Sequence, residues 1–217
     1  YHHTESGYHP LDKLWANKNI DYVGIDAYFP LTDGLKQKDI TVDKIAEGWG
    51  SGVEYDYVKD GNKNVPIEAE DAIKNLEYWW THKHKNPDGK FTEWEPKMKP
   101  VVFTEVGFIS MDGTTNQPAS YYYPSETTDA QSRMPLGSDG KVDYNAQYIA
   151  IQGTEKFWND LHKSNPELQD LVSRRDYYKI DARYGYDKYE NGDSDYYAYN
   201  HDLKVADVLV AGLDHSG

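Results

Sequence analysis

The segment KPVVFTEVGF, residues 99–108, decides the fold of this chain. Val101, Val102 and Phe103 form a continuous apolar run, which is typical of a strand that is buried on both faces of a parallel sheet. Glu105 follows two residues after this run. We therefore predict a buried parallel strand whose C-terminal end presents the carboxylate of Glu105.

Two further strands are predicted on either side of this segment. Residues 20–30, IDYVGIDAYFP, are rich in β-branched and aromatic residues and close with a proline, a pattern that favours a strand. Asp26 lies at its end, and Tyr28 follows. Residues 177–180, YYKI, are a third candidate strand, which leads directly into Asp181 and Arg183.

Helices are predicted between the strands. Apolar spacing favours helices over 41–49, with Thr41 as N-cap, over 67–84 and over 143–164, with a brief helical turn over 11–16. Residues 53–66 and 110–142 are predicted to be loops, and 203–213 a terminal helix or strand. Strands that alternate with helices predict an α/β fold with parallel strands and helical crossovers.

The expected architecture is part of a (β/α)8 barrel. Three strands cannot close an eight-stranded barrel, so either further strands lie in the segments predicted as loops or this chain is the C-terminal part of a larger barrel. The chain begins with Tyr1 rather than Met, which leads us to suspect a fragment or a processed chain. We expect one partial barrel domain over residues 1–217.

Composition limits the function. The net charge of −14 would repel phosphate backbones, so we expect no nucleic-acid partner. No apolar run approaches the roughly 20 residues that a membrane span requires. The chain has no cysteine, which excludes disulfides and thiolate metal sites. Aromatic residues make up 14%, which suits either sugar-stacking platforms or Tyr-rich surface loops.

Carboxylates at strand ends suggest glycosidase chemistry. Hydrolysis of a glycosidic bond generally uses two carboxyl groups, and barrel enzymes place their active sites at the C-terminal ends of the strands. Glu105 is the first candidate, although an ion pair with a nearby Arg or Lys is the alternative. Asp26 is the second, with Tyr28 as a hydrogen-bond donor that keeps a carboxylate ionised. The alternative for Asp26 is that it caps the following turn.

Other residues are candidates for binding. Of Trp79 and Trp80, we expect one in the core and the other facing a groove. Arg183 can orient a carboxylate beside Asp181 through paired hydrogen bonds, although a surface ion pair explains both residues equally simply. His82 and His84 form a His-x-His pair. Without a third ligand at a supporting spacing, such a pair is more often a solvated helix end, and we expect no metal and no cofactor.

Several stretches, in order along the chain, resemble the TIM-barrel-like glycoside hydrolase domain of gene transfer agent and phage tail proteins. The strongest is the opening segment, KPVVFTEVGF. The others are LW at 14–15, NIDYVGIDAYFPL at 19–31, EGW at 47–49, EYDY at 54–57, WW at 79–80 with His82 and His84, NQP at 116–118, YPSE at 123–126 and DAR at 181–183.

This resemblance implies a barrel related to retaining β-glycosidases. It places Glu105 on the seventh strand as nucleophile, and Asp26 and Tyr28 on the sixth. The acid/base carboxylate of such barrels lies on an earlier strand, which is absent here. The expected parent protein hydrolyses a β-linked glycan. The alternative is a non-catalytic module that binds glycan or other tail proteins within a phage-like particle, made in the bacterial cytoplasm.

Overall fold

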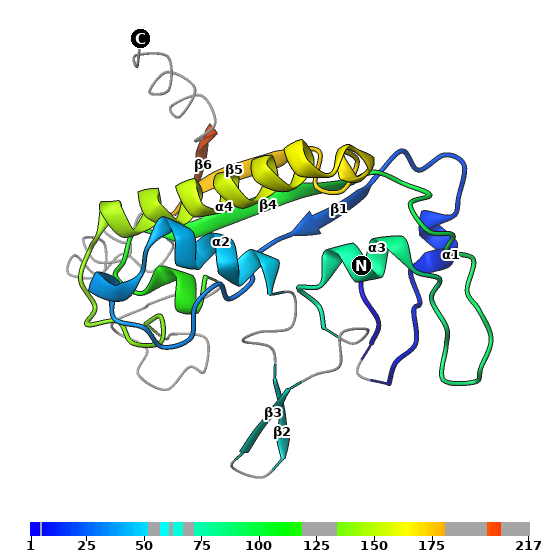
Figure 1. Cartoon of the computed structure of the whole chain (residues 1–217), viewed down its shortest axis with the longest axis horizontal. Coiled ribbons are helices and arrows are strands. Elements are labelled where there is room, and N and C mark those ends of the chain that lie inside the picture. Colours follow the sequence, from blue (N-terminus) through cyan, green and yellow to red (C-terminus); the bar gives the residue numbers. More distant parts are fainter. Residues whose placement is uncertain are drawn as a thin grey trace.

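The computed structural model describes residues 1–4, 6–51, 57–60, 63–66, 72–118, 134–180 and 199–204. For residues 57–60, 63–66, 178–180 and 199–204 it describes the backbone alone. These residues form a mixed sheet with helices packed on it, and a separate two-stranded hairpin (Figure 1).

The sheet has the strand order β1-β4-β5-β6. β1 (Val23–Asp26) and β5 (Arg175–Ile180) both run parallel to the central strand, β4 (Val101–Ile109). β6 (Tyr199–Lys204) is antiparallel to β5. The three predicted parallel strands are confirmed, with β1 shorter and β5 longer than expected. Of the predicted terminal element over 203–213, the described part belongs to β6.

Side-chain caps begin three of the helices. Thr41 accepts from Lys44 N at the start of α2 (Val42–Gly50), Asn75 from Tyr78 N at α3 (Leu76–Thr81), and Asp143 from Ala146 N at α4 (Tyr144–Ser164). Each cap satisfies an amide that the first helical turn leaves without a partner. The predictions for α2 and α4, and for the short α1 (Asp12–Trp15), are confirmed.

Two predictions of local structure were wrong. The helix expected over 67–84 is α3 alone in its described part, because Asn75 caps a new start and His82 is already extended. Within the predicted loop 53–66, β2 (Tyr57–Asp60) pairs antiparallel with β3 (Lys63–Pro66). The two residues between them in the sequence are Gly61-Asn62, a hairpin signal that the loop prediction overlooked.

Short 3-10 helices complete the described elements: η1 (Gln37–Asp39), η2 (Thr114–Asn116) and η3 (Pro166–Leu168).

One face of the sheet is covered by α2 and α4 (Figure 1). The ring of Phe103 from β4 lies 5.5 Å from that of Trp49 and 5.6 Å from that of Trp158. The two helices come close at Gly153, where an added Cβ would lie 2.5 Å from Ile45. Burial of these aromatic rings supplies much of the apolar area that stabilises the layer.

The central strand contains a β-bulge. On β4, Phe103 pairs with Arg175 and Val106 with Tyr177, so three steps along β4 match two along β5. Phe103 and Val106 both belong to the main core. Thr104 and Glu105 between them are both half-buried, and the extra residue turns both side chains toward the face opposite the helices.

The predicted position of Glu105 was wrong. The residue does not lie at the end of its strand, since β4 continues to Ile109. Glu105 instead lies opposite Asp26, the last residue of β1. The carboxylate therefore projects from the middle of the longest strand, on the face that the helices leave uncovered.

Candidate functional site

Tyr28 holds the carboxylate of Glu105. Its hydroxyl donates to Glu105 Oε2 at 2.8 Å, while the amide of Ala27 donates to the Glu105 carbonyl at 2.7 Å. The ring of Tyr28 packs on Ile109 and Met111. Two of the predicted site residues are thus brought together, and one hydroxyl fixes one of the two carboxylate oxygens.

Asp26 is bound from the same bulge. Thr104 Oγ1 donates to Asp26 Oδ1 at 2.9 Å, and Asp26 is otherwise exposed. Gly24 makes this approach possible, because a Cβ there would lie 2.9 Å from Thr104 Cγ2. The side chain therefore bonds a neighbouring strand, and the described contacts do not include the predicted alternative of a cap on the following turn.

Further charged side chains lie at the start of β5, on the side away from α4. On β5, Arg175 and Tyr177 bond Glu155 of α4, which places the alternate residues Arg174 and Asp176 on the opposite side. Arg174 lies over the ring of Tyr22 at 5.5 Å and 3.3 Å from Asp176. Among the described residues no lysine or arginine pairs with Glu105, so the ion-pair alternative is not observed.

The predicted binding residues do not join this face. Trp79 and Trp80 are each 2% exposed. Trp80 Nε1 donates to the Lys99 carbonyl at 2.7 Å, and the ring of Trp79 lies 4.5 Å from that of Trp94. Neither indole faces a groove, because both side chains point from α3 into the main core. Asp181 and Arg183 lie outside the described residues.

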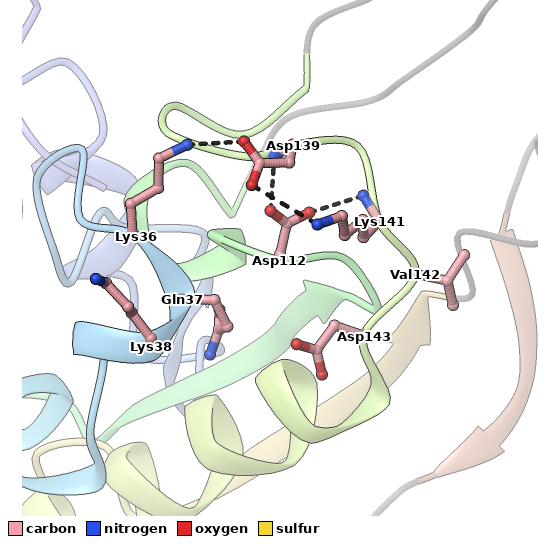
Figure 2. Close-up of a pocket in the computed structure, with 8 residues that line it drawn as sticks. All are labelled: Lys36, Gln37, Lys38, Asp112, Asp139, Lys141, Val142 and Asp143. Atoms are coloured by element: carbon pink, nitrogen blue, oxygen red, sulfur yellow. Dashed lines mark hydrogen bonds and ion pairs between the residues drawn. The ribbon is translucent and has the colours of Figure 1, made fainter.

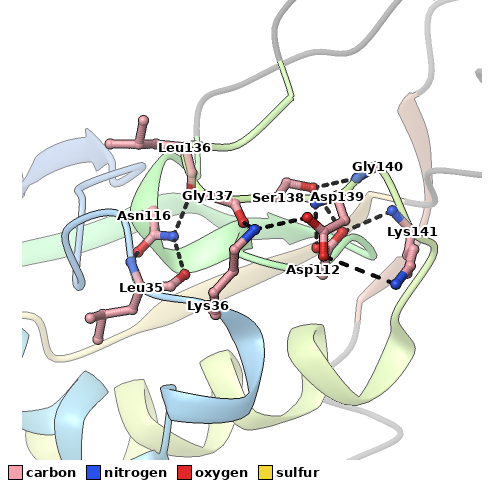
Figure 3. Close-up of polar contacts among 10 residues, drawn as sticks. All are labelled: Leu35, Lys36, Asp112, Asn116, Leu136, Gly137, Ser138, Asp139, Gly140 and Lys141. Atoms are coloured by element: carbon pink, nitrogen blue, oxygen red, sulfur yellow. Dashed lines mark hydrogen bonds and ion pairs between the residues drawn. The ribbon is translucent and has the colours of Figure 1, made fainter.

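A pocket of about 410 Å³ lies apart from Glu105, lined by charged residues of 36–38, 112 and 139–143 (Figure 2). Its central carboxylate is already engaged, since Asp112 accepts from Ser138 Oγ and from the amides of Asp139 and Lys141 (Figure 3). Burial acts to raise the pKa of Asp112, but the three donated hydrogen bonds lower it below its ordinary value. We assign this carboxylate to holding the loop in place.

The two residues of the His-x-His pair have different surroundings. His82 is exposed and bonds the Tyr78 carbonyl at 2.9 Å, as expected for a solvated helix end. His84 is 5% exposed, and its Nδ1 lies 2.8 Å from Asp12 Oδ2. The prediction of solvation was wrong for His84, because its partner lies 72 residues away in the sequence, where no spacing rule reaches.

The geometry is that of a sheet with three parallel strands, helices on one face and a carboxylate on β4. A family model described as the GTA TIM-barrel-like domain matches residues 2–184. The chain belongs to this gene transfer agent family. The family match includes all three parallel strands and ends before β6. No curated protein matches the chain.

Membership confirms the sequence resemblance to the gene transfer agent TIM-barrel-like domain. The described residues form a sheet in which three strands run parallel, with helices packed on it, consistent with a partial α/β fold. No helix among them is long and apolar enough to cross a membrane.

Proposed function

We propose that this chain supplies the nucleophile of a retaining glycoside hydrolase, with Glu105 in that role and the remaining strands of the barrel provided elsewhere in the parent protein. The observation that carries the proposal is the bulge at Thr104–Glu105. It projects a carboxylate onto the uncovered face beside Asp26. In the proposed barrel this face would look inward, and Glu105 would lie level with Asp26 at the C-terminal end of β1, the end at which such enzymes bind substrate.

The chemistry follows from the two oxygens of Glu105. Tyr28 donates to Oε2, which holds that oxygen in place and leaves Oε1 for attack. Oε1 would bond to the anomeric carbon while a second carboxyl group protonates the departing glycosidic oxygen. That second group would then take a proton from the water that hydrolyses the glycosyl ester. We assign it to another strand of the parent barrel.

A direct test traps the intermediate. The parent protein would be incubated with a panel of activated 2-fluoro glycosides and digested for mass spectrometry. We expect a covalent sugar on the peptide that contains Glu105, and none in Glu105→Gln. The matched control is Glu77→Gln, the same change at an exposed position on α3. Adduct on a different carboxylate, or turnover that survives in Glu105→Gln, would overturn the assignment.

A second function rests on the edge of the sheet. Among the described residues β1 pairs with β4 only, and an edge strand offers backbone groups for pairing with another chain. We propose, as the alternative, a non-catalytic module of a tail-like particle that binds glycan or another tail protein. It predicts no adduct across the panel, and partner binding that survives Glu105→Gln combined with Asp26→Asn.

A further inference from the structure

Two segments that are distant in sequence meet at a cluster of imidazoles around one buried carboxylate. His9 and Asp12 come from the N-terminal region, and His84 follows α3. One potential ligand atom from each of the three lies within 4.8 Å of the others. Asp12 is fully buried and His84 is 5% exposed. This cluster plays no part in the proposed hydrolysis.

The carboxylate of Asp12 is satisfied on one side only. Its Oδ2 accepts from Thr92 Oγ1 at 2.5 Å and faces His84 Nδ1 at 2.8 Å. Its Oδ1 is buried and has no hydrogen-bond partner among the described residues. A buried carboxylate oxygen without a partner is costly. Such an atom beside two imidazoles points to a ligand that the protein atoms alone do not account for.

His84 has the arrangement of a metal-binding histidine. Its Nε2 lies 2.7 Å from the Trp79 carbonyl, which can only accept, so Nε2 carries a proton. This leaves Nδ1 directed at Asp12. A histidine that binds a metal through one ring nitrogen commonly donates the other N–H to a carbonyl, which fixes the ring. The ring of His84 is stacked between those of His9 and Trp94, with centroids at 4.4 and 5.2 Å. An ion lies in the plane of each imidazole that binds it, so the His9 ring would turn out of this stack to share an ion with His84.

Hydrogen bonds to the main chain of His9 and of His84 also hold these two residues in place. The amide of His9 donates to Asn86 Oδ1 at 3.0 Å, and Thr92 N donates to the His84 carbonyl at 3.0 Å. His2, which is 9% exposed, lies next to His9 with ring centroids 6.2 Å apart. The residues that surround the cluster are therefore positioned by contacts that do not depend on a bound ion.

We propose that His9, Asp12 and His84 bind a divalent transition metal of the zinc class. Two imidazoles and one carboxylate are the donor set that Zn²⁺ takes in tetrahedral sites, with bonds of about 2.0–2.2 Å. The contact between His84 Nδ1 and Asp12 Oδ2 gives way to the ion on binding. Asp12 Oδ1 gains a partner, and water or His2 takes the fourth position. The ion ties the N-terminal segment to the residues that follow α3.

The test measures Zn²⁺ binding by calorimetry on the untagged parent protein, in the presence of a competing chelator. Co²⁺ then reports the coordination geometry through its visible spectrum. The test variant is His9→Gln. His9 is half-buried, and its replacement leaves the His84–Asp12 pair in place. The matched control is His82→Gln, two residues from His84 but exposed. Circular dichroism checks that each variant is folded.

We expect wild type and His82→Gln to bind about one Zn²⁺ per chain, with a tetrahedral Co²⁺ spectrum. We expect His9→Gln to bind at least 10-fold more weakly. Three results would each overturn the proposal: no binding by wild type, unchanged affinity in His9→Gln, or loss of binding in His82→Gln. None of these readouts depends on glycosidase activity, so failure here leaves the assignment of Glu105 untouched.

Discussion

Two glutamates on opposite sides of the same sheet have contrasting surroundings. Glu155, on α4, accepts two hydrogen bonds from Arg175, at 2.6 and 2.8 Å, and a third from Tyr177 at 2.7 Å. Glu105, on the uncovered side, accepts one from Tyr28. A carboxylate paired with a guanidinium contributes to folding and is a poor nucleophile. The one with a single hydroxyl partner retains an oxygen for chemistry.

This contrast extends to whole faces. The side under α2 and α4 is an aromatic core in which Trp49 and Trp158 enclose Phe103. The opposite side presents Asp26, Thr104 and Glu105. Stability and proposed function are thus divided between the two faces of one strand. Substitutions on the first face should change the free energy of unfolding, and those on the second should change chemistry.

The largest expected effect is on the covered face. Trp158→Ala removes a buried ring that contacts Phe103 and Trp49, and we expect a loss of about 3–5 kcal/mol in unfolding free energy, measured by urea denaturation. Asp26→Ala, on the uncovered face, is the comparison and should cost about 1 kcal/mol at most. Equal losses would contradict the division of roles.

A smaller effect is expected at the half-buried pair of Glu155 and Arg175. Glu155→Gln leaves Arg175 without its counter-charge, and we expect a loss of about 1–3 kcal/mol near pH 7. Burial acts to raise the pKa of Glu155, but the hydrogen bonds and charge of Arg175 lower it overall.

The sign of the pH dependence follows. Because the folded pKa lies below the unfolded one, the stabilisation is complete above about pH 4.3 and is lost as pH falls through the folded value. The difference between wild type and Glu155→Gln should therefore shrink in acid. A difference that stays constant from pH 7 to pH 3 would show that the pair does not titrate as described. Glu167→Gln, exposed, is the control.

The smallest effect on stability is expected at Tyr28. Tyr28→Phe keeps the ring on Ile109 and Met111 but removes the donor to Glu105. We expect about 1 kcal/mol or less in stability, while adduct formation with the 2-fluoro glycosides slows by about 10-fold or more. Tyr22→Phe, on the same face, should leave that rate unchanged. A Tyr28→Phe variant with the wild-type rate would remove Tyr28 from the proposed site.

Local patterns predicted much of the fold. The apolar run at 101–103 and the caps Thr41 and Asp143 depend on neighbours in the sequence, so β4, α2 and α4 were predictable. Glu105 was identified as the candidate nucleophile from the same run. Its partner Tyr28 lies 77 residues away in the sequence. The parallel pairing of β1 and β4 in the structure brings the two side chains together.

The errors have physical causes of their own. A bulge depends on how β4 matches two neighbouring strands, which no single stretch reveals, so Glu105 was expected at a strand end. Trp79 and Trp80 are adjacent on a predicted helix, and one was expected in the core and the other at a groove. Both are buried in the main core, where Trp80 bonds the Lys99 carbonyl and Trp79 contacts Trp94. His84 and Asp12 meet only through tertiary structure.

Fixed anchors on both sides of residues 119–133 have a consequence for how this domain tolerates change. Asn116 donates to the carbonyls of Leu35 and Leu136, and Asp112 holds the turn at 138–141 (Figure 3). A reporter peptide grafted between these anchors should therefore leave the sheet intact, because the hydrogen bonds that hold both ends lie outside the graft.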